Sequence, residues 1–141
     1  MAAPTESFSR NFWSHTAEAP PDTPPLLGAH RSDVTVIGGG YTGLSTALHL
    51  AKNGVNVRVL EAKQVGFGAS GRNNGQVIPA YSRHNPDDIE RIFGKDAGRN
   101  LNAWVASSAD LVFDLIRQYD IHCEAAQNGW LQPAHRPSRM K

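Results

Sequence analysis

Apolar runs and a helical repeat follow one another in the first half of this chain, and their order predicts an α/β fold. Val34–Ile37 is a short run rich in β-branched residues, which is typical of a buried parallel strand. From Thr42 to Asn53 the apolar residues recur at helical spacing, and Gly54 fits the left-handed position just past a helix end. Val55–Leu60 predicts a second strand. Together these segments form a strand, a glycine-rich turn, a helix and a strand. The face of the helix that we expect to be buried consists of Leu44, Ala47, Leu48 and Ala51.

Two further helices are predicted in the second half. Asn85-Pro-Asp-Asp88 combines a capping residue, a proline at the first helical position and acids facing the helix dipole, and the helix should end near Gly94. A longer helix should run from about Asp96 to Tyr119, with an amphipathic core face that includes Trp104 as an anchor. The other members of this face are Leu101, Val105, Ser108, Leu111, Val112 and Leu115. Ile121–Ala134 should form strands around a turn at Asn128-Gly129.

Residues 1–32 are predicted to be a Pro-rich N-terminal extension. Five of the nine prolines lie here, and proline lacks the backbone donor that helices and sheets use, so the segment should be extended. Phe8, Phe12 and Trp13 argue against complete disorder, and we expect them to pack on the body of the protein.

Composition and charge exclude several classes of partner. The 141 residues carry a net charge of +1 without a run of Lys or Arg, so no nucleic-acid partner is expected. Residues 1–20 lack the apolar core of a signal peptide, and the most apolar stretch, residues 34–51, contains four glycines and a histidine. We therefore expect a soluble cytoplasmic protein with no membrane partner. The six histidines and the single cysteine, Cys123, show no metal-ligand spacing, so no metal site is expected.

Three glycines between the first strand and the helix carry the main chemical signal. Gly38 permits a tight turn, Gly40 lets the backbone approach a pyrophosphate, and Gly43 lets the helix pack closely on the strands. The amides around Thr42, at the helix start, would face the anion with the helix dipole behind them. Glu61 ends the second strand, where a carboxylate can accept both ribose hydroxyls and repel the 2′-phosphate of NADP. This context predicts dinucleotide binding, and a Rossmann-like module that binds nothing is the alternative.

The loop after the second strand favours FAD over NAD. NAD-binding domains usually enter another crossover helix at this point, whereas here the chain is polar, glycine-rich and irregular. Ser70 and the loop amides can reach the same pyrophosphate, and Arg72 can neutralise it. Asn74 and Gln76 could donate hydrogen bonds to the flavin ring, where such donors tune its electron demand. A solvated surface loop is the alternative interpretation.

These segments resemble a known enzyme family. Asp33–Ser45, Val59-Leu-Glu61 and Gly68–Gln76 are similar to the D-amino-acid oxidase and glycine oxidase superfamily, and within it to the gamma-glutamylputrescine oxidoreductase branch. The resemblance covers most of residues 7–141 and is most specific between residues 33 and 77. It implies a Rossmann-type, GR2-like FAD-binding βαβ unit, which forms the N-terminal part of a two-domain FAD/NAD(P)-binding-like α/β fold.

The resemblance also implies a cofactor, a reaction and a set of binding residues. Family members bind FAD and oxidise a C–N bond of an amine or amino acid by hydride transfer to the flavin. We expect non-covalent FAD and a small-molecule amine as substrate. The expected cofactor-binding residues are Gly38, Gly40, Thr42 and Gly43 for the pyrophosphate, Glu61 for the adenosine ribose, and Ser70, Arg72, Asn74, Gly75 and Gln76 for the phosphates and the flavin.

Family enzymes run to several hundred residues, so this chain is expected to be an N-terminal fragment. Residues 33–120 would be the N-terminal portion of the FAD-binding domain with a helical insertion, and residues 121–141 the start of a truncated substrate domain. The catalytic residues are expected beyond Lys141, and the 141 residues alone should neither hold FAD tightly nor catalyse a reaction. An NAD-dependent dehydrogenase module and a non-catalytic fragment are the alternatives.

Overall fold

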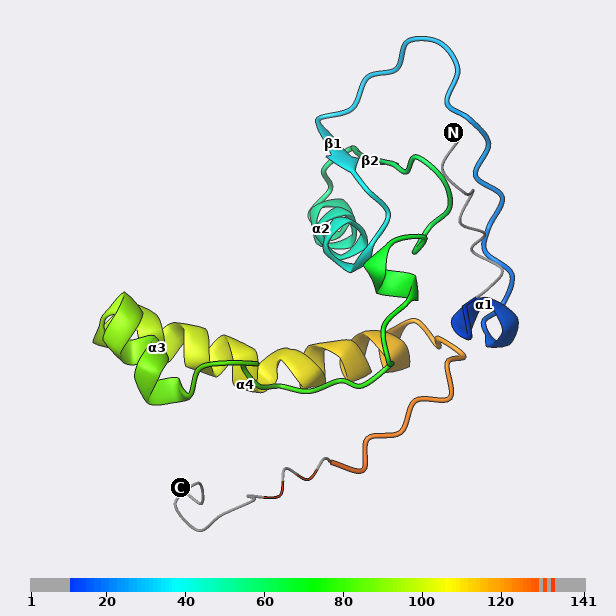
Figure 1. Ribbon diagram of the computed structural model, residues 1–141. Coiled ribbons are helices and arrows are strands. Elements are labelled where there is room, and N and C mark those ends of the chain that lie inside the picture. The colour runs from blue at the N-terminus through cyan, green and yellow to red at the C-terminus, as the bar shows by residue number, and fades with distance from the viewer. Residues whose placement is uncertain (1–10, 130, 132, 134–141) are drawn as a thin grey trace, which may run out of the picture. The chain divides into compact units, whose positions relative to one another are not determined.

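The chain divides into two compact units, residues 1–75 and residues 76–141, and Figure 1 labels their main helices and strands. The computed structural model describes residues 11–129, 131 and 133. The first unit, residues 1–75, contains α1 (Trp13–Thr16), β1 (Val34–Ile37), α2 (Tyr41–Lys52), β2 (Val57–Leu60) and the short 3₁₀ helix η2 (Ala69–Gly71). The second unit, residues 76–141, contains α3 (Pro86–Phe93) and α4 (Lys95–Gln118).

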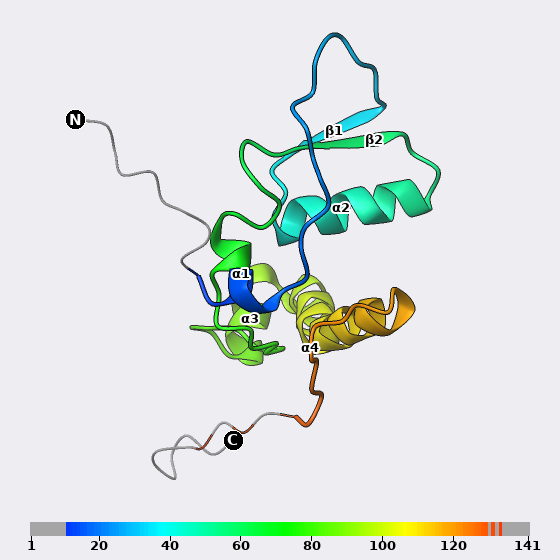
Figure 2. The same cartoon turned by 90° about the vertical axis from the view of Figure 1, so that its right-hand side faces the viewer.

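The first unit is built on a two-stranded parallel sheet. β1 and β2 pair in register from Val34 with Val57 to Ile37 with Leu60. Figure 2 shows α2 running alongside the two strands, and Ala47 of this helix is buried, with 8% of its surface exposed. The order of strand, turn, helix and strand is therefore confirmed, and the fold is mixed α/β.

The second strand is shorter than the predicted Val55–Leu60, and the N–H groups of its first two predicted residues bond outside the ladder with β1. The N–H of Val55 donates to the Leu50 carbonyl at the end of α2, and the N–H of Asn56 donates to the Asp33 carboxylate. These bonds fasten the helix exit and the start of the sheet to each other. Gly54, just after the helix, has φ +77, as the left-handed position predicted for it requires.

In the second unit, α3 begins and ends as its sequence predicts. The side chain of Asn85 accepts from the Asp88 N–H, and the Asp88 side chain accepts from the Asn85 N–H, which forms a capping box with Pro86 at the first helical position. Gly94 has φ +83 and separates α3 from α4. Ile89 of α3 is only 4% exposed, and at the buried Gly98 the backbone of α4 packs directly against Glu90 of α3.

The apolar face predicted for residues 96–119 is only partly covered in α4. Trp104 has 70% of its surface exposed, so its prediction as a core anchor is wrong, and Leu111 and Val112 are also exposed. Among the described residues of this unit, α3 is the one other helix, and its 8 residues are too few to cover the face of a 24-residue helix. Neither helix, nor any other in the described part of the chain, is long and apolar enough to cross a membrane.

No strand forms around Asn128-Gly129 within residues 121–129, 131 and 133, so the predicted hairpin is wrong there; residues 130, 132 and 134 lie outside the described set. Side chains hold this segment instead. Arg117 of α4 donates to the Gln127 side chain, and Gln127 donates to Asp110. An isolated two-stranded hairpin is marginally stable, whereas these bonds fasten the segment to an existing helix.

Within its described residues, 11–32, the N-terminal extension contains one short helix that the sequence did not predict. In α1, Trp13 packs on the loop at residues 73–75, as expected for this aromatic residue. Phe12 lies edge-to-face against Trp13, with 5.0 Å between the ring centroids, and stays largely exposed. Phe8 lies outside the described residues.

We predict that Gly98→Ala destabilises the α3–α4 pair, although alanine is the better helix former. A Cβ at residue 98 would lie 2.5 Å from the Cα of Glu90. One helix must then move away, which costs about 1–3 kcal/mol and exceeds the ~1 kcal/mol gain in helix propensity. Thermal unfolding followed by circular dichroism should show a lower melting temperature.

The matched control is Asn100→Ala, at an exposed position of the same helix. This variant should be neutral or slightly stabilising. A Gly98→Ala variant that is as stable as the control would contradict the close contact between the two helices.

Candidate functional site

The turn between β1 and α2 needs two of its glycines for its own geometry. Gly38 has φ +104, which side-chain-bearing residues rarely adopt, and its N–H donates to the Leu60 carbonyl at 2.8 Å. A Cβ on Gly43 would lie 2.0 Å from the Gly38 carbonyl oxygen and 3.3 Å from the Val36 side chain. Gly38 and Gly43 therefore let α2 pack tightly on β1.

Glu61 closes the other side of this turn. Its Oε2 accepts from the Gly39 N–H at 2.7 Å and its Oε1 from the Lys63 N–H at 3.0 Å. These amides, that of Gly39 first, lower the pKa of the carboxyl below its usual value. An ionised carboxylate has about four acceptor positions, so each oxygen can still accept a hydrogen bond from a ligand hydroxyl.

Ser70 reaches the start of α2 from the loop. Its Oγ accepts from the Tyr41 N–H at 2.9 Å. A Cβ on Gly40 would lie 2.8 Å from this Oγ, so the space that glycine leaves open is lined by the serine hydroxyl. Thr42 lies exposed in the first turn of the helix. Five predicted site residues thus meet at one end of the sheet: Gly38, Gly40, Gly43, Glu61 and Ser70.

The other predicted loop residues lie differently. The Nε of Arg72 donates to the Phe67 carbonyl at 3.0 Å, and its guanidinium lies 4.7 Å from the centre of the Phe67 ring, so it contacts its own loop. Gly75 has φ +74 and lies against Trp13. Asn74 is exposed. Gln76 is the first residue of the second unit, and its contact with a flavin stays a prediction.

Asn73 joins this loop to α1 and to the start of α2, although it is not among the cofactor-binding residues predicted from the sequence. It takes part in four hydrogen bonds, with Trp13, Tyr41, Ser70 and Gly75. One of them was readable in the sequence, because an Asn two residues before a glycine is typical of an Asx turn, in which the side-chain oxygen accepts the N–H two residues on. The contacts with Trp13 and Tyr41 join segments far apart in the chain and have no local signal.

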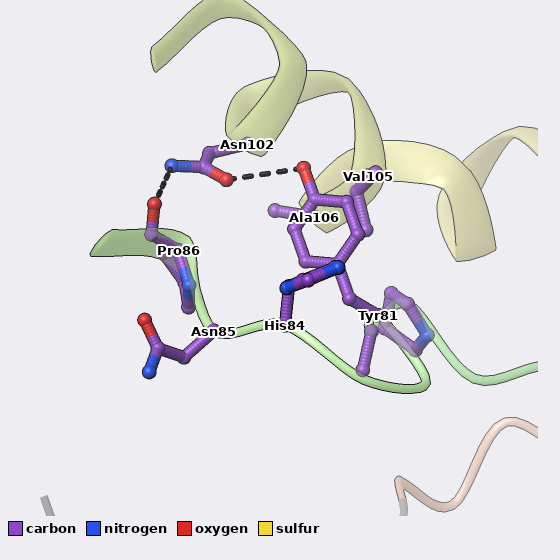
Figure 3. A pocket seen from close by; sticks show the side chains of 9 residues that line it. Tyr81, His84, Asn85, Pro86, Asn102, Val105 and Ala106 are labelled. Carbon is purple, nitrogen blue, oxygen red and sulfur yellow. Dashed lines mark hydrogen bonds between the residues drawn. The ribbon is translucent and has the colours of Figure 1, made fainter. Parts of the chain in front are cut away.

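The second unit has a pocket of about 320 Å³, shown in Figure 3. The Tyr81 hydroxyl donates to Asn102 at 3.0 Å, and Asn102 donates to the Pro86 carbonyl at 3.1 Å, so these polar groups fasten the loop before α3 to α4. None of the predicted site residues lines this pocket. It is lined by Pro79, Ala80, Tyr81, His84, Asn85, Pro86, Asn102, Val105 and Ala106. The described residues contain no group of three or more His, Cys, Asp or Glu side chains that could hold a metal ion.

Comparison with known proteins gives the family. Residues 33–141 match the family model described as "FAD dependent oxidoreductase" (DAO). The chain belongs to the FAD-dependent oxidoreductase family. The matched residues include both the glycine turn and the loop that carries Ser70 and Asn73, so the two features that form the candidate site lie within the family domain. No solved structure matches the chain.

Several curated proteins are similar to the chain. It is 48% identical over 97 residues to the gamma-glutamylputrescine oxidoreductase of Escherichia coli, which covers 69% of the chain and 22% of the relative. It is 41% identical over 101 residues to the Haemophilus influenzae protein named "Probable oxidoreductase OrdL", and this match covers 72% of the chain and 23% of the relative. A protein of the same name from Rhizobium meliloti is 32% identical over 128 residues, and this match covers 91% of the chain and 29% of the relative. The chain therefore spans between about a fifth and a third of the length of these relatives.

We predict that the Gly39 amide reports the ionisation of Glu61. The pKa of Glu61 is lowered from 4.5, so its hydrogen bonds stabilise the turn fully above pH 4.5, and this contribution is lost as the pH falls through the lower, folded pKa. The ¹⁵N and amide-proton shifts of Gly39 should titrate with a midpoint below 4.5. The Glu61→Gln variant should lack this titration.

The control for this titration is Glu18→Gln, at an exposed position in the same unit. It should leave the Gly39 titration unchanged. A midpoint at or above 4.5 in the unaltered chain would contradict the hydrogen bond between the Gly39 amide and the Glu61 carboxylate.

Proposed function

We propose that this chain supplies the FAD-binding βαβ unit of a flavoenzyme that oxidises the C–N bond of a small-molecule amine or amino acid. The unit would be of the Rossmann type and would belong to one domain of a two-domain protein. The observation that carries the proposal is the Glu61 carboxylate bound to the Gly39 amide, within a family domain that depends on FAD. This geometry supports recognition of the adenosine end of the cofactor.

The adenosine ribose fits Glu61. Both carboxylate oxygens already accept one backbone N–H, which fixes the direction of the side chain and leaves further acceptor capacity on each oxygen. The two neighbouring ribose hydroxyls would offer one hydrogen-bond donor to each of these two oxygens. A 2′-phosphate would be repelled by the same charge, so the site favours FAD over a phosphorylated dinucleotide.

The pyrophosphate fits the start of α2. Glycine at position 40 keeps side-chain atoms away from the backbone, and the first N–H groups of the helix point out of its N-terminus with the dipole behind them. The Ser70 hydroxyl accepts from Tyr41, so its own hydrogen can be donated to a phosphate oxygen. The proposed pyrophosphate residues are Gly38, Gly40, Thr42, Gly43 and Ser70.

The remaining loop residues would serve the phosphates and the flavin side of the non-covalent cofactor. Arg72 would leave the Phe67 carbonyl to approach the phosphates, and Asn74, Gly75 and Gln76 would face the flavin. A bound flavin would supply the acceptor for a hydride from the carbon next to the substrate nitrogen. We assign no catalytic residue in this chain. An amine of the gamma-glutamylputrescine type is proposed as substrate because a relative of that name is similar to most of the chain.

We predict that the 141-residue chain binds the ADP portion of FAD weakly, with a dissociation constant on the order of 1 mM, because the site is exposed. In a ¹⁵N NMR titration, ADP should shift the amides of Gly39, Gly40 and Tyr41. FAD should shift the same three amides and, in addition, those of Arg72 and Asn74, which ADP leaves unchanged. NAD⁺ should reproduce only the ADP shifts. Equal effects of NAD⁺ and FAD on the loop would favour an NAD-binding module instead.

We predict that Gly40→Val prevents flavin binding. A Cβ at this position would already lie 2.8 Å from the Ser70 Oγ, and the branched side chain would fill the space proposed for the pyrophosphate. A suitable test protein is a hybrid in which this chain replaces the matching residues of the Escherichia coli gamma-glutamylputrescine oxidoreductase. The unaltered hybrid should purify with flavin absorption and oxidise gamma-glutamylputrescine.

The Gly40→Val hybrid should lose both the flavin absorption and the oxidation. The control is Ala62→Val, which adds similar bulk at an exposed position beside Glu61 and should keep the flavin. Full flavin content in the Gly40→Val hybrid would exclude the proposed pyrophosphate position.

A further inference from the structure

We propose that Asn73 is a positioning residue that couples the N-terminal segment, through Trp13, to the hydroxyl of Ser70. The proposal rests on the proposed function, because Ser70 is one of the residues expected to bind the cofactor pyrophosphate. The inference assigns to residues 11–16, which precede the family domain at residues 33–141, a part in shaping the cofactor site.

The side-chain amide of Asn73 is fixed by three hydrogen bonds. Its Nδ2 donates to the Ser70 carbonyl at 2.6 Å and to the Tyr41 hydroxyl at 3.2 Å, and its Oδ1 accepts from the Gly75 N–H at 2.6 Å. The reverse orientation would set a donor against the Gly75 N–H and an acceptor against the Ser70 carbonyl. One orientation therefore satisfies both backbone groups, and it uses both amide hydrogens.

Trp13 holds the same residue from the other side. Its indole Nε1 donates to the Asn73 carbonyl at 2.7 Å. Its six-membered ring occupies the place of a side chain on Gly75, since a Cβ there would lie 2.7 Å from two ring carbons. The N-terminal segment is thus attached to the loop by a directional hydrogen bond and by a packing contact that requires glycine.

Ser70 is consequently held at two points. Its carbonyl accepts from the Asn73 side chain, and its Oγ accepts from the Tyr41 N–H. Loss of the Asn73 amide would release the backbone of Ser70, so its hydroxyl would have to be ordered again when a phosphate binds, at a cost in affinity. The effect should therefore fall on ligands that carry phosphates.

The test compares ADP with adenosine as ligands of the 141-residue chain in ¹⁵N NMR titrations. Adenosine presents the ribose to Glu61 but has no pyrophosphate. In Asn73→Ala, the affinity for ADP should fall about three- to tenfold, while the affinity for adenosine stays the same. Trp13→Phe keeps an aromatic ring and removes the donor to Asn73, and it should lower ADP affinity in the same selective way.

Trp104→Phe is the matched control, because this tryptophan lies in the second unit, and it should change neither affinity. The double variant of Trp13 and Asn73 should lose less ADP affinity than the product of the two single losses, as expected for residues that act through one another. Trp13→Phe changes no atom of the loop, so it tests the coupling even where Asn73→Ala fails to fold.

The outcomes separate this inference from the proposed function. If the unaltered chain binds neither ADP nor adenosine, the proposed function is wrong, and this inference falls with it. If the unaltered chain binds ADP but Asn73→Ala and Trp13→Phe bind it equally well, the proposed function stands and the coupling is wrong. Equal losses for ADP and adenosine would also overturn the inference, because they would indicate a general loss of structure.

Discussion

The hydrogen bond from the Gly39 amide to the Glu61 carboxylate joins the ends of two parallel strands that have no hairpin between them. Parallel strands leave a sheet at the same edge, so the residues after β1 and after β2 must share a small space. Gly39 is buried there, and a Cβ on it would lie 3.3 Å from the Glu61 side chain. The acid at the end of β2 can therefore bond to the turn only where the turn carries a small residue.

The same glycine also fixes the loop. Its carbonyl accepts from the Gly66 N–H at 2.9 Å, and two residues further on the Tyr41 N–H donates to the Ser70 Oγ. Residues 62–75 are thus attached to the turn at two points, although they contain only the short helix η2. An irregular loop held in this way can present backbone and side-chain donors in a defined direction, as a cofactor-binding loop of an FAD-dependent oxidoreductase requires.

The features that the sequence predicted correctly are those with local causes. β1 needed only a run of β-branched residues, and α3 needed only the capping sequence Asn85–Asp88, so both were found with their correct bounds or nearly so. The exposure of Trp104 could not be predicted in this way, because the amphipathic repeat of α4 indicates an apolar face and says nothing about which element covers it. For the same reason, the strands predicted around Asn128 do not form within the described residues 121–129, 131 and 133, since a strand requires a partner.

The candidate site also contains residues that a local pattern identifies and residues whose contacts depend on distant segments. Gly38, Gly43 and Glu61 could be chosen from their spacing, because a tight turn between parallel strands places them together. Arg72 was chosen for its charge, but in the structure its guanidinium lies on the Phe67 ring, a contact that depends on how the loop folds. Asn73 has a local Asx signal, yet its bond with Trp13 spans 60 residues of sequence and could not be read from either segment alone.

The place of the Trp13 ring over Gly75 has a consequence for how this chain can evolve. Two ring carbons lie only 2.7 Å from where a Cβ at residue 75 would be, so the two positions cannot enlarge independently. A lineage that replaces Gly75 by a larger residue must first lose the tryptophan or move the segment that carries it. Across homologues, residue size at these two distant positions should therefore covary, with an aromatic ring at one position accompanying glycine at the other.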